Sequence, residues 1–175
     1  MEVKEFPNQS TLKKNTIDFL INIPLFDELN GEELSIVADY IAFIEVASGE
    51  YLFKEGDKGD YMCFVVNGTL DVIKQCTPTK NVILSTIYKG HSIGEMAVID
   101  HTPRSASIKA REVSNLLVLS EKNFDIIINS YPRIGVKLLK RILRLLSLNM
   151  RRTSSKLADN MLMMSQILKK DKSSK

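Results

Sequence analysis

The chain has 175 residues, of which 44% are hydrophobic and 26% are charged, a composition typical of one globular domain with an appendage. It contains no apolar run of the roughly eighteen residues that a transmembrane helix needs, and its polar, acidic start does not resemble a signal peptide. Two cysteines and two histidines are too few for a disulfide framework or a metal site, so we expect a cytoplasmic protein without a cofactor.

The net charge of +3 conceals an uneven distribution along the chain. Residues 1–130 contain 12 Lys and Arg against 19 Asp and Glu, whereas residues 131–175 contain 12 against 2. A basic end of this kind can bind nucleic acid or acidic lipid. The alternative is a solvated helix face that ends in a disordered tail.

The first forty residues show helical patterns. Apolar residues at helical spacing precede Pro24, which ends that stretch. Asn30 can cap a second, shorter helix that carries Leu34, Val37 and Ala38.

Between residues 41 and 120, short segments rich in β-branched and aromatic residues alternate with turns that contain Gly and Asp. The strands that we expect are 41–46, 50–54, 61–66, 69–74, 81–88, 104–110 and 115–120. Asn67-Gly68, between two of them, predicts a tight hairpin, because both residues tolerate a positive φ. Closely spaced strands of this kind indicate an antiparallel sandwich or barrel and not a βαβ sheet.

The helical period returns after residue 120. Ser120 is suited to cap a short helix over 121–130, and Pro132 is suited to the first turn of a longer one. The long helix carries an apolar seam at Leu139, Leu143, Leu146, Met150, Leu157, Met161, Met164 and Leu168. Over 132–150 we expect this helix both to cover the barrel and to pair with a second copy, giving a homodimer. Beyond residue 153 the pattern fits either a continuing helix or a break at Thr-Ser-Ser.

The stretch IGEMAVIDHTPRSAS, residues 93–107, combines one acid, one arginine and several small residues. We expect a short helical turn here, at which Gly94 allows a close approach to the backbone and the first amides favour an anion. Arg104 supplies a planar fork that matches two phosphate oxygens, while Glu95 can accept a hydrogen bond from a sugar hydroxyl. One arginine suits a singly charged phosphodiester best.

An alternative is that Glu95 and Arg104 form a salt bridge that holds a β-turn together. The sequence shows neither paired acids with a metal nor a His/Asp metal cluster, so we expect a non-enzymatic protein without catalytic residues.

Three blocks in order, IPLFDELNGEEL, YLFKEGDKGDYMCFVVNGTLDVI and IGEMAVIDHTPRSAS, resemble the cyclic nucleotide-binding domain family. That family includes the bacterial catabolite activator, the regulatory subunits of the cAMP-dependent kinase and cyclic-nucleotide-gated channels. The resemblance extends from about Ile23 to Met150. It implies an α+β fold, namely an antiparallel, jelly-roll-like β-roll with N-terminal helices, a short phosphate-binding helix and a long C-terminal helix.

The resemblance also implies which residues bind the ligand. Glu95 would bind the ribose 2′-OH, and Arg104 the cyclic phosphate. Backbone amides would assist at Gly94, Met96, Ala97, Ser105 and Ala106. Asn149 could pair with an adenine edge, with Ser147 and Arg144 as rivals; alternatively, Asn149 is a polar seam residue that fixes a dimer register. The resemblance favours cAMP, with cGMP as the alternative.

The expected organisation is an N-terminal helical arm over 1–22, a cyclic nucleotide-binding β-roll over 23–130, and C-terminal helices with a basic tail over 131–175. The family's transcription factors add a winged helix-turn-helix, and the 25 residues after Met150 are too few for one, so sequence-specific DNA binding is not expected. The hypothesis is a cyclic-nucleotide receptor that signals through its C-terminal helix to a protein effector. Its rival is an interaction module that keeps the fold without using the ligand.

Overall fold

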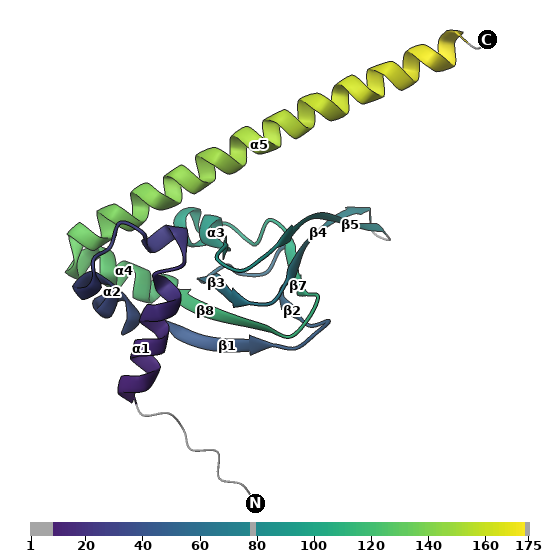
Figure 1. Ribbon diagram of the computed structural model, residues 1–175. Helices are drawn as coiled ribbons and strands as arrows, with labels where there is room; N and C mark the ends of the chain where they lie inside the picture. Colours follow the sequence, from purple (N-terminus) through teal and green to yellow (C-terminus); the bar gives the residue numbers. More distant parts are fainter. Residues whose placement is uncertain (1–8, 78–79, 174–175) are drawn as a thin grey trace, which may run out of the picture. The chain divides into compact units, whose positions relative to one another are not determined.

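The computed structural model describes residues 9–77 and 80–173 (Figure 1). The chain divides into two compact units, Met1–Leu138 and Leu139–Lys175, which are described separately. The expected boundaries at 22 and 130 stay predictions.

From residue 9 onward, two α-helices and one 3-10 helix precede the sheets: α1 (Gln9–Leu20), η1 (Pro24–Phe26) and α2 (Gly31–Ala38). The Asn30 side chain accepts a hydrogen bond from the Glu33 backbone N–H at 2.9 Å, and the Glu33 carboxylate accepts one from the Asn30 N–H at 2.9 Å. This capping box satisfies two backbone donors that the first turn would otherwise leave unpaired. It confirms the helix start predicted at Asn30.

Eight strands form two four-stranded antiparallel sheets. The strands are β1 (Ala42–Val46), β2 (Tyr51–Phe53), β3 (Tyr61–Asn67), β4 (Leu70–Thr77), β5 (Lys80–Ile87), β6 (Ser92–Ile93), β7 (Ser107–Ala110) and β8 (Ser114–Ser120). Their order is β1-β8-β3-β6 in one sheet and β2-β7-β4-β5 in the other. Apolar residues from both sheets, such as Cys63 and Leu70, pack together in a buried hydrophobic cluster. The expected antiparallel β-roll is confirmed.

The tight hairpin predicted at Asn67-Gly68 is wrong. Strand β3 pairs with β6 and β8, whereas β4 pairs with β5 and β7, so this turn carries the chain from one sheet to the other. Gly68 does have a positive φ of 102°, but Asn67 does not share it. The local turn signal was therefore correct at Gly68, while the strand pairing was not.

Two further differences lie beside the predicted anion site. The strand expected over 104–110 begins only at Ser107, because residues 101–106 form an irregular loop. The two-residue strand β6 was not predicted, and it leads directly into α3 (Glu95–Asp100). The expected helical turn between two strands is confirmed.

Two helices follow the sheets: α4 (Glu121–Ser130) and α5 (Pro132–Ser173). The Ser120 hydroxyl accepts a hydrogen bond from the Asn123 N–H at 3.1 Å, which confirms the predicted cap. Within the first unit, Lys137 in the first turns of α5 pairs with Glu33 of α2 at 2.7 Å.

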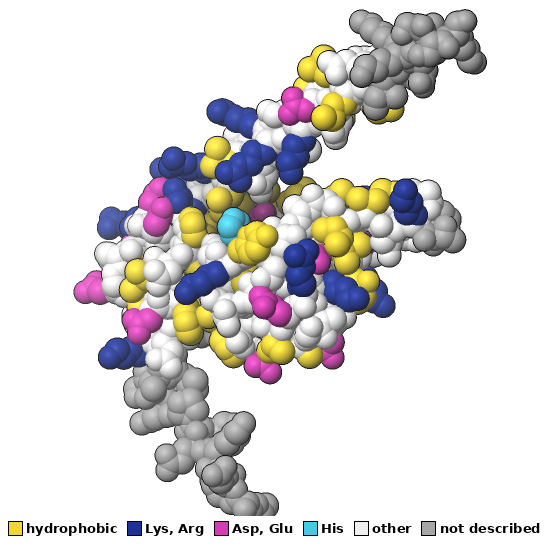
Figure 2. All heavy atoms as spheres, turned by 45° about the vertical axis from the view of Figure 1, so that its right-hand side comes forward, with side chains coloured by type: hydrophobic (Ala, Val, Ile, Leu, Met, Phe, Trp, Pro, Cys, Tyr) yellow, Lys and Arg dark blue, Asp and Glu magenta, His cyan; other side chains and the backbone are white. Residues whose placement is uncertain are grey.

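Helix α5 continues without a break through residues 153–155, which answers the question that the sequence left open. The Ser155 hydroxyl donates to the Arg151 carbonyl at 3.1 Å, a hydrogen bond that lets serine remain inside a helix. Figure 2 shows yellow hydrophobic and dark blue basic side chains along α5. Among the helices in the described ranges, none is both long and apolar enough to cross a bilayer.

The turn at Gly68 supplies a test of this fold. A Cβ at position 68 would lie 2.7 Å from the Ser114 Cα, and the φ of 102° is unfavourable for any other residue. We expect Gly68→Ala to lower the free energy of unfolding by about 2–3 kcal/mol, measured by urea denaturation. Gly49→Ala is the matched control, because Gly49 has a φ of 83° but no atom near its Cβ position. Equal losses in the two variants would contradict the crowding at Ser114.

Candidate ligand-binding site

The candidate site is centred on α3 and the loop that follows it. Gly94 is the residue before α3 and adopts a left-handed conformation with a φ of 83°. A Cβ at this position would collide with the Arg104 guanidinium and approach the Tyr61 carbonyl to 3.2 Å. Gly94 therefore meets both a conformational and a steric requirement.

The Arg104 guanidinium is buried, with 3% of the residue exposed. Its two terminal nitrogens donate to backbone carbonyls, at 3.2 Å to Gly94 and 2.8 Å to Tyr61. The guanidinium carbon lies 4.0 Å from the Phe53 ring centroid and 4.5 Å from that of Tyr61. The group is thus held between two aromatic faces, which attract a cation.

The backbone of Arg104 is fixed by the loop between β2 and β3. Its N–H donates to the Asp57 carbonyl at 2.9 Å, and its carbonyl accepts from the Gly56 N–H at 2.9 Å. Arg104 is therefore positioned by β2, β3 and the loop between them, through residues 43 to 51 positions earlier in the chain.

Glu95 is also buried, with 8% of the residue exposed. Burial raises the pKa of its carboxyl because desolvation disfavours the charged form, while the positive charge of Arg104 partly opposes this rise. Among the described residues, no carboxylate lies within ion-pair distance of Arg104. The salt bridge between Glu95 and Arg104 that the sequence allowed is therefore not formed.

Two buried polar atoms without hydrogen-bond partners indicate which kind of ligand the site suits. Within the described ranges, the buried side-chain polar atoms without a hydrogen-bond partner are Glu95 Oε2 and Arg104 Nε. Buried polar atoms without partners are costly and rare. One is an acceptor and the other a cationic donor, so together they suit a ligand that has a hydroxyl group and an anionic group.

The remaining predicted residues differ in their surroundings. Ala97 is buried, and a Cβ on Gly59 would collide with it. Met96 lies in α3 and is 48% exposed. Ser105 is exposed and Ala106 is half-buried, in the loop between α3 and β7. Asn149 is an exposed residue of α5 in the second unit.

Sequence reasoning missed the roles of Phe53 and Tyr61. Both residues lie in segments that were predicted to be strands, where an aromatic side chain indicates core packing. Tyr61 also donates from its hydroxyl to the Leu52 carbonyl at 3.0 Å, which fixes its ring. No local sequence pattern could show that these rings enclose an arginine more than 40 residues away.

Within the described residues, metal chemistry would need a cluster of ligand side chains, and thiol chemistry at Cys63 would need a reactive thiolate. No group of three or more His, Cys, Asp or Glu side chains is placed to hold a metal ion within those residues. Cys63 is buried, and desolvation raises the pKa of its thiol to about 12, so it is not a reactive thiolate.

The raised pKa of Glu95 predicts a pH-dependent effect on stability. The folded protein keeps this proton to a higher pH than the unfolded chain does, so the carboxyl costs stability as the pH rises above the ordinary glutamate value of about 4.3. We expect Glu95→Gln to gain stability relative to wild type as the pH rises above about 4 in urea denaturation. Glu45→Gln, at an exposed position of β1, is the control. A difference between Glu95→Gln and wild type that does not change with pH would contradict the shift.

The model of the cyclic nucleotide-binding domain matches residues 43–131. A solved cyclic nucleotide-binding domain from Methylobacillus flagellatus KT is 30% identical, covers 81% of this chain and 80% of that one, and has a TM-score of 0.72.

Two curated relatives come from Drosophila melanogaster. Isozyme 1 of the cGMP-dependent protein kinase is 32% identical over 99 residues, which are 55% of this chain and 13% of that protein. The type II regulatory subunit of the cAMP-dependent protein kinase is 32% identical over 115 residues, which are 65% of this chain and 30% of that protein. The chain therefore spans less than a third of the length of either relative. With its β-roll and the match over 43–131, it belongs to the cyclic nucleotide-binding domain family.

Proposed function

We propose that this chain is a cyclic-nucleotide receptor module. The observation that carries the proposal is that the unsatisfied buried atoms, Glu95 Oε2 and Arg104 Nε, belong to the two side chains to which the family resemblance assigns the ligand. A cyclic nucleotide offers a 2′-hydroxyl donor to the first and a phosphate acceptor to the second. Binding would therefore satisfy both atoms at once.

The phosphate is proposed to lie against Arg104. A buried guanidinium without a carboxylate is costly, and an anion of one unit charge neutralises it. Backbone amides would complete the contact at Gly94, Met96, Ala97, Ser105 and Ala106. Glu95 would accept a charge-assisted hydrogen bond from the ribose.

The choice of purine rests on the resemblance. The two Drosophila relatives, one named for cGMP and the other for cAMP, are equally identical to this chain, at 32%. We propose cAMP as the ligand, with Asn149 against the base, because an amide can both donate to and accept from an adenine edge. cGMP is the alternative that titration decides.

The proposed phosphate contact is tested at Arg104. We expect Arg104→Ala to weaken cAMP binding by about 2–4 kcal/mol in calorimetric titration, because it removes a charge-assisted contact to a desolvated phosphate. Arg111→Ala is the control, since Arg111 follows β7, pairs at 2.7 Å with Asp71 of β4 and is not among the proposed ligand-binding residues. Equal affinity in Arg104→Ala and wild type would rule out this pose.

The output is proposed to pass through α5 to a protein effector. A ligand can shift such a helix only if it binds one arrangement of the domain more tightly than another. Many of the seam residues of α5 are exposed: Leu143 64%, Met150 67%, Leu157 60%, Met161 65% and Met164 64%. This exposed seam also favours the second candidate function, a ligand-independent interaction module, because it would bind a partner with or without nucleotide.

The homodimer through 132–150 is a proposal that the charge distribution makes testable. Residues 131–175 contain 12 basic and 2 acidic side chains, so pairing two copies brings like charges together. We expect self-association, followed by sedimentation velocity, to strengthen between about 0.05 M and about 0.5 M salt as the repulsion is screened.

The seam itself is tested by substitution. Leu143→Asp should abolish the dimer, whereas Leu148→Asp, at a 43% exposed leucine outside the seam, introduces the same charge and should retain it. A monomer at both salt concentrations would contradict the dimer.

A further inference from the structure

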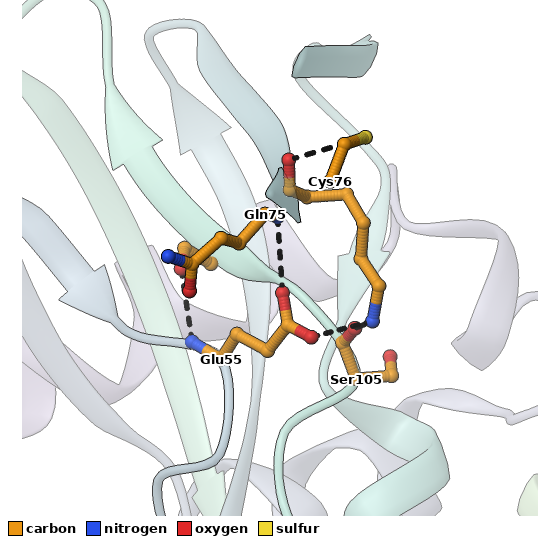
Figure 3. Close-up of polar contacts among 6 residues, drawn as sticks. Glu55, Gln75, Cys76 and Ser105 are labelled. Carbon is orange, nitrogen blue, oxygen red and sulfur yellow. Dashed lines mark hydrogen bonds and ion pairs between the residues drawn. The ribbon is translucent and has the colours of Figure 1, made fainter. Parts of the chain in front are cut away.

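A lysine on the neighbouring strand contacts the backbone of the proposed phosphate loop. Lys74 of β4 donates from Nζ to the Ser105 carbonyl at 2.7 Å and to Glu55 Oε1 at 2.6 Å. Figure 3 shows Glu55 and Ser105 with the polar contacts that connect them to β4. The ammonium group therefore bridges the β2–β3 loop and the loop after α3.

Glu55 is itself held by two further hydrogen bonds besides its contact with Lys74. Its second carboxylate oxygen accepts from the Gln75 N–H at 3.2 Å, and its own N–H donates to the Ser107 hydroxyl at 2.9 Å (Figure 3). Its salt bridge with Lys74 measures 2.6 Å. The Glu55 carboxylate is therefore held in place, and it in turn fixes the ammonium group of Lys74.

The position of the Ser105 carbonyl determines where the next amide points. The register between β4 and β7 ends at Ile73↔Ser107, so the peptide between Ser105 and Ala106 lies beyond the last paired residue and is not oriented by the sheet. In a planar trans peptide the C=O and the N–H point in opposite directions. Because the Ser105 carbonyl points to Lys74, the Ala106 N–H points away from Lys74.

The same contact strengthens that amide as a donor. A hydrogen bond from an ammonium to a peptide carbonyl polarises the peptide, and its N–H then donates more strongly. We infer that Lys74 is a positioning residue for the ligand, which orients and polarises the Ser105–Ala106 peptide so that the Ala106 N–H can donate to the phosphate. The inference rests on the proposed function, because it assigns the anion to this amide.

A purely structural role makes a different prediction. The Lys74 and Glu55 side chains are 40% and 30% exposed, and exposed ion pairs contribute little to stability. The pair between Lys13 and Asp39 is a suitable reference, since its atoms are 2.7 Å apart, its side chains are 35% and 56% exposed, and it joins α1 to the end of α2. If Lys74 acts only as such a pair, its loss should resemble the loss of Lys13.

The experiment compares Lys74→Met with Lys13→Met in the full chain. We expect Lys74→Met to weaken cAMP binding about three- to tenfold, the range for loss of one hydrogen bond, while its thermal midpoint matches that of Lys13→Met. Lys74→Arg keeps a cationic donor and should recover part of the affinity. Equal affinity in Lys74→Met, Lys13→Met and wild type would overturn the inference.

A second measurement needs no nucleotide. The carbonyl ¹³C and following amide ¹⁵N resonances at Ser105–Ala106 report directly on the hydrogen bond to this peptide. The orienting contact is supported if both resonances shift in Lys74→Met and neither shifts in Lys13→Met. It is overturned if both resonances are unchanged in Lys74→Met. If wild type binds neither cAMP nor cGMP, the proposed function fails, and these resonances alone decide whether Lys74 orients the peptide.

Discussion

The buried guanidinium of Arg104 is the constraint on which the rest of the site depends. It lies between the rings of Phe53 and Tyr61 and donates to two carbonyls, yet no carboxylate of the described residues neutralises it. A charge removed from water in this way is stable only if its surroundings compensate it. Ring faces and carbonyl dipoles supply part of the compensation, and an anion would supply the remainder. The proposed ligand, with one negative charge, would therefore complete the site.

Several local features exist because of that constraint. Gly94 leaves room for the guanidinium, and the β2–β3 loop holds the Arg104 backbone through Gly56 and Asp57. Lys74 donates to the carbonyl of Ser105, the residue that follows Arg104. These contacts come from both sheets, so the β-roll serves as a rigid frame for a short irregular loop. Precise placement matters because an anion is bound by several donors that must converge on it.

The parts of the fold that local chemistry determines could be predicted from the sequence. Neighbouring residues determine the caps at Asn30 and Ser120, the β-rich segments between turns, and the helical turn at α3. The structure contains all of these features. Strand pairing at Gly68 and the rings around Arg104 depend on residues far apart in the chain, and no local pattern encodes them. Glu95 and Arg104 were identified by chemistry and resemblance together; their binding roles stay predictions.

A crystal structure of the chain with cAMP tests the proposed anion-binding role of Arg104 most directly. We predict a phosphate oxygen within about 3 Å of Arg104 Nε and the ribose 2′-oxygen within about 3 Å of Glu95 Oε2. Both atoms that are unsatisfied in the present structure would then have partners. A nucleotide bound elsewhere, or one bound with Arg104 Nε still unpaired, would contradict the account.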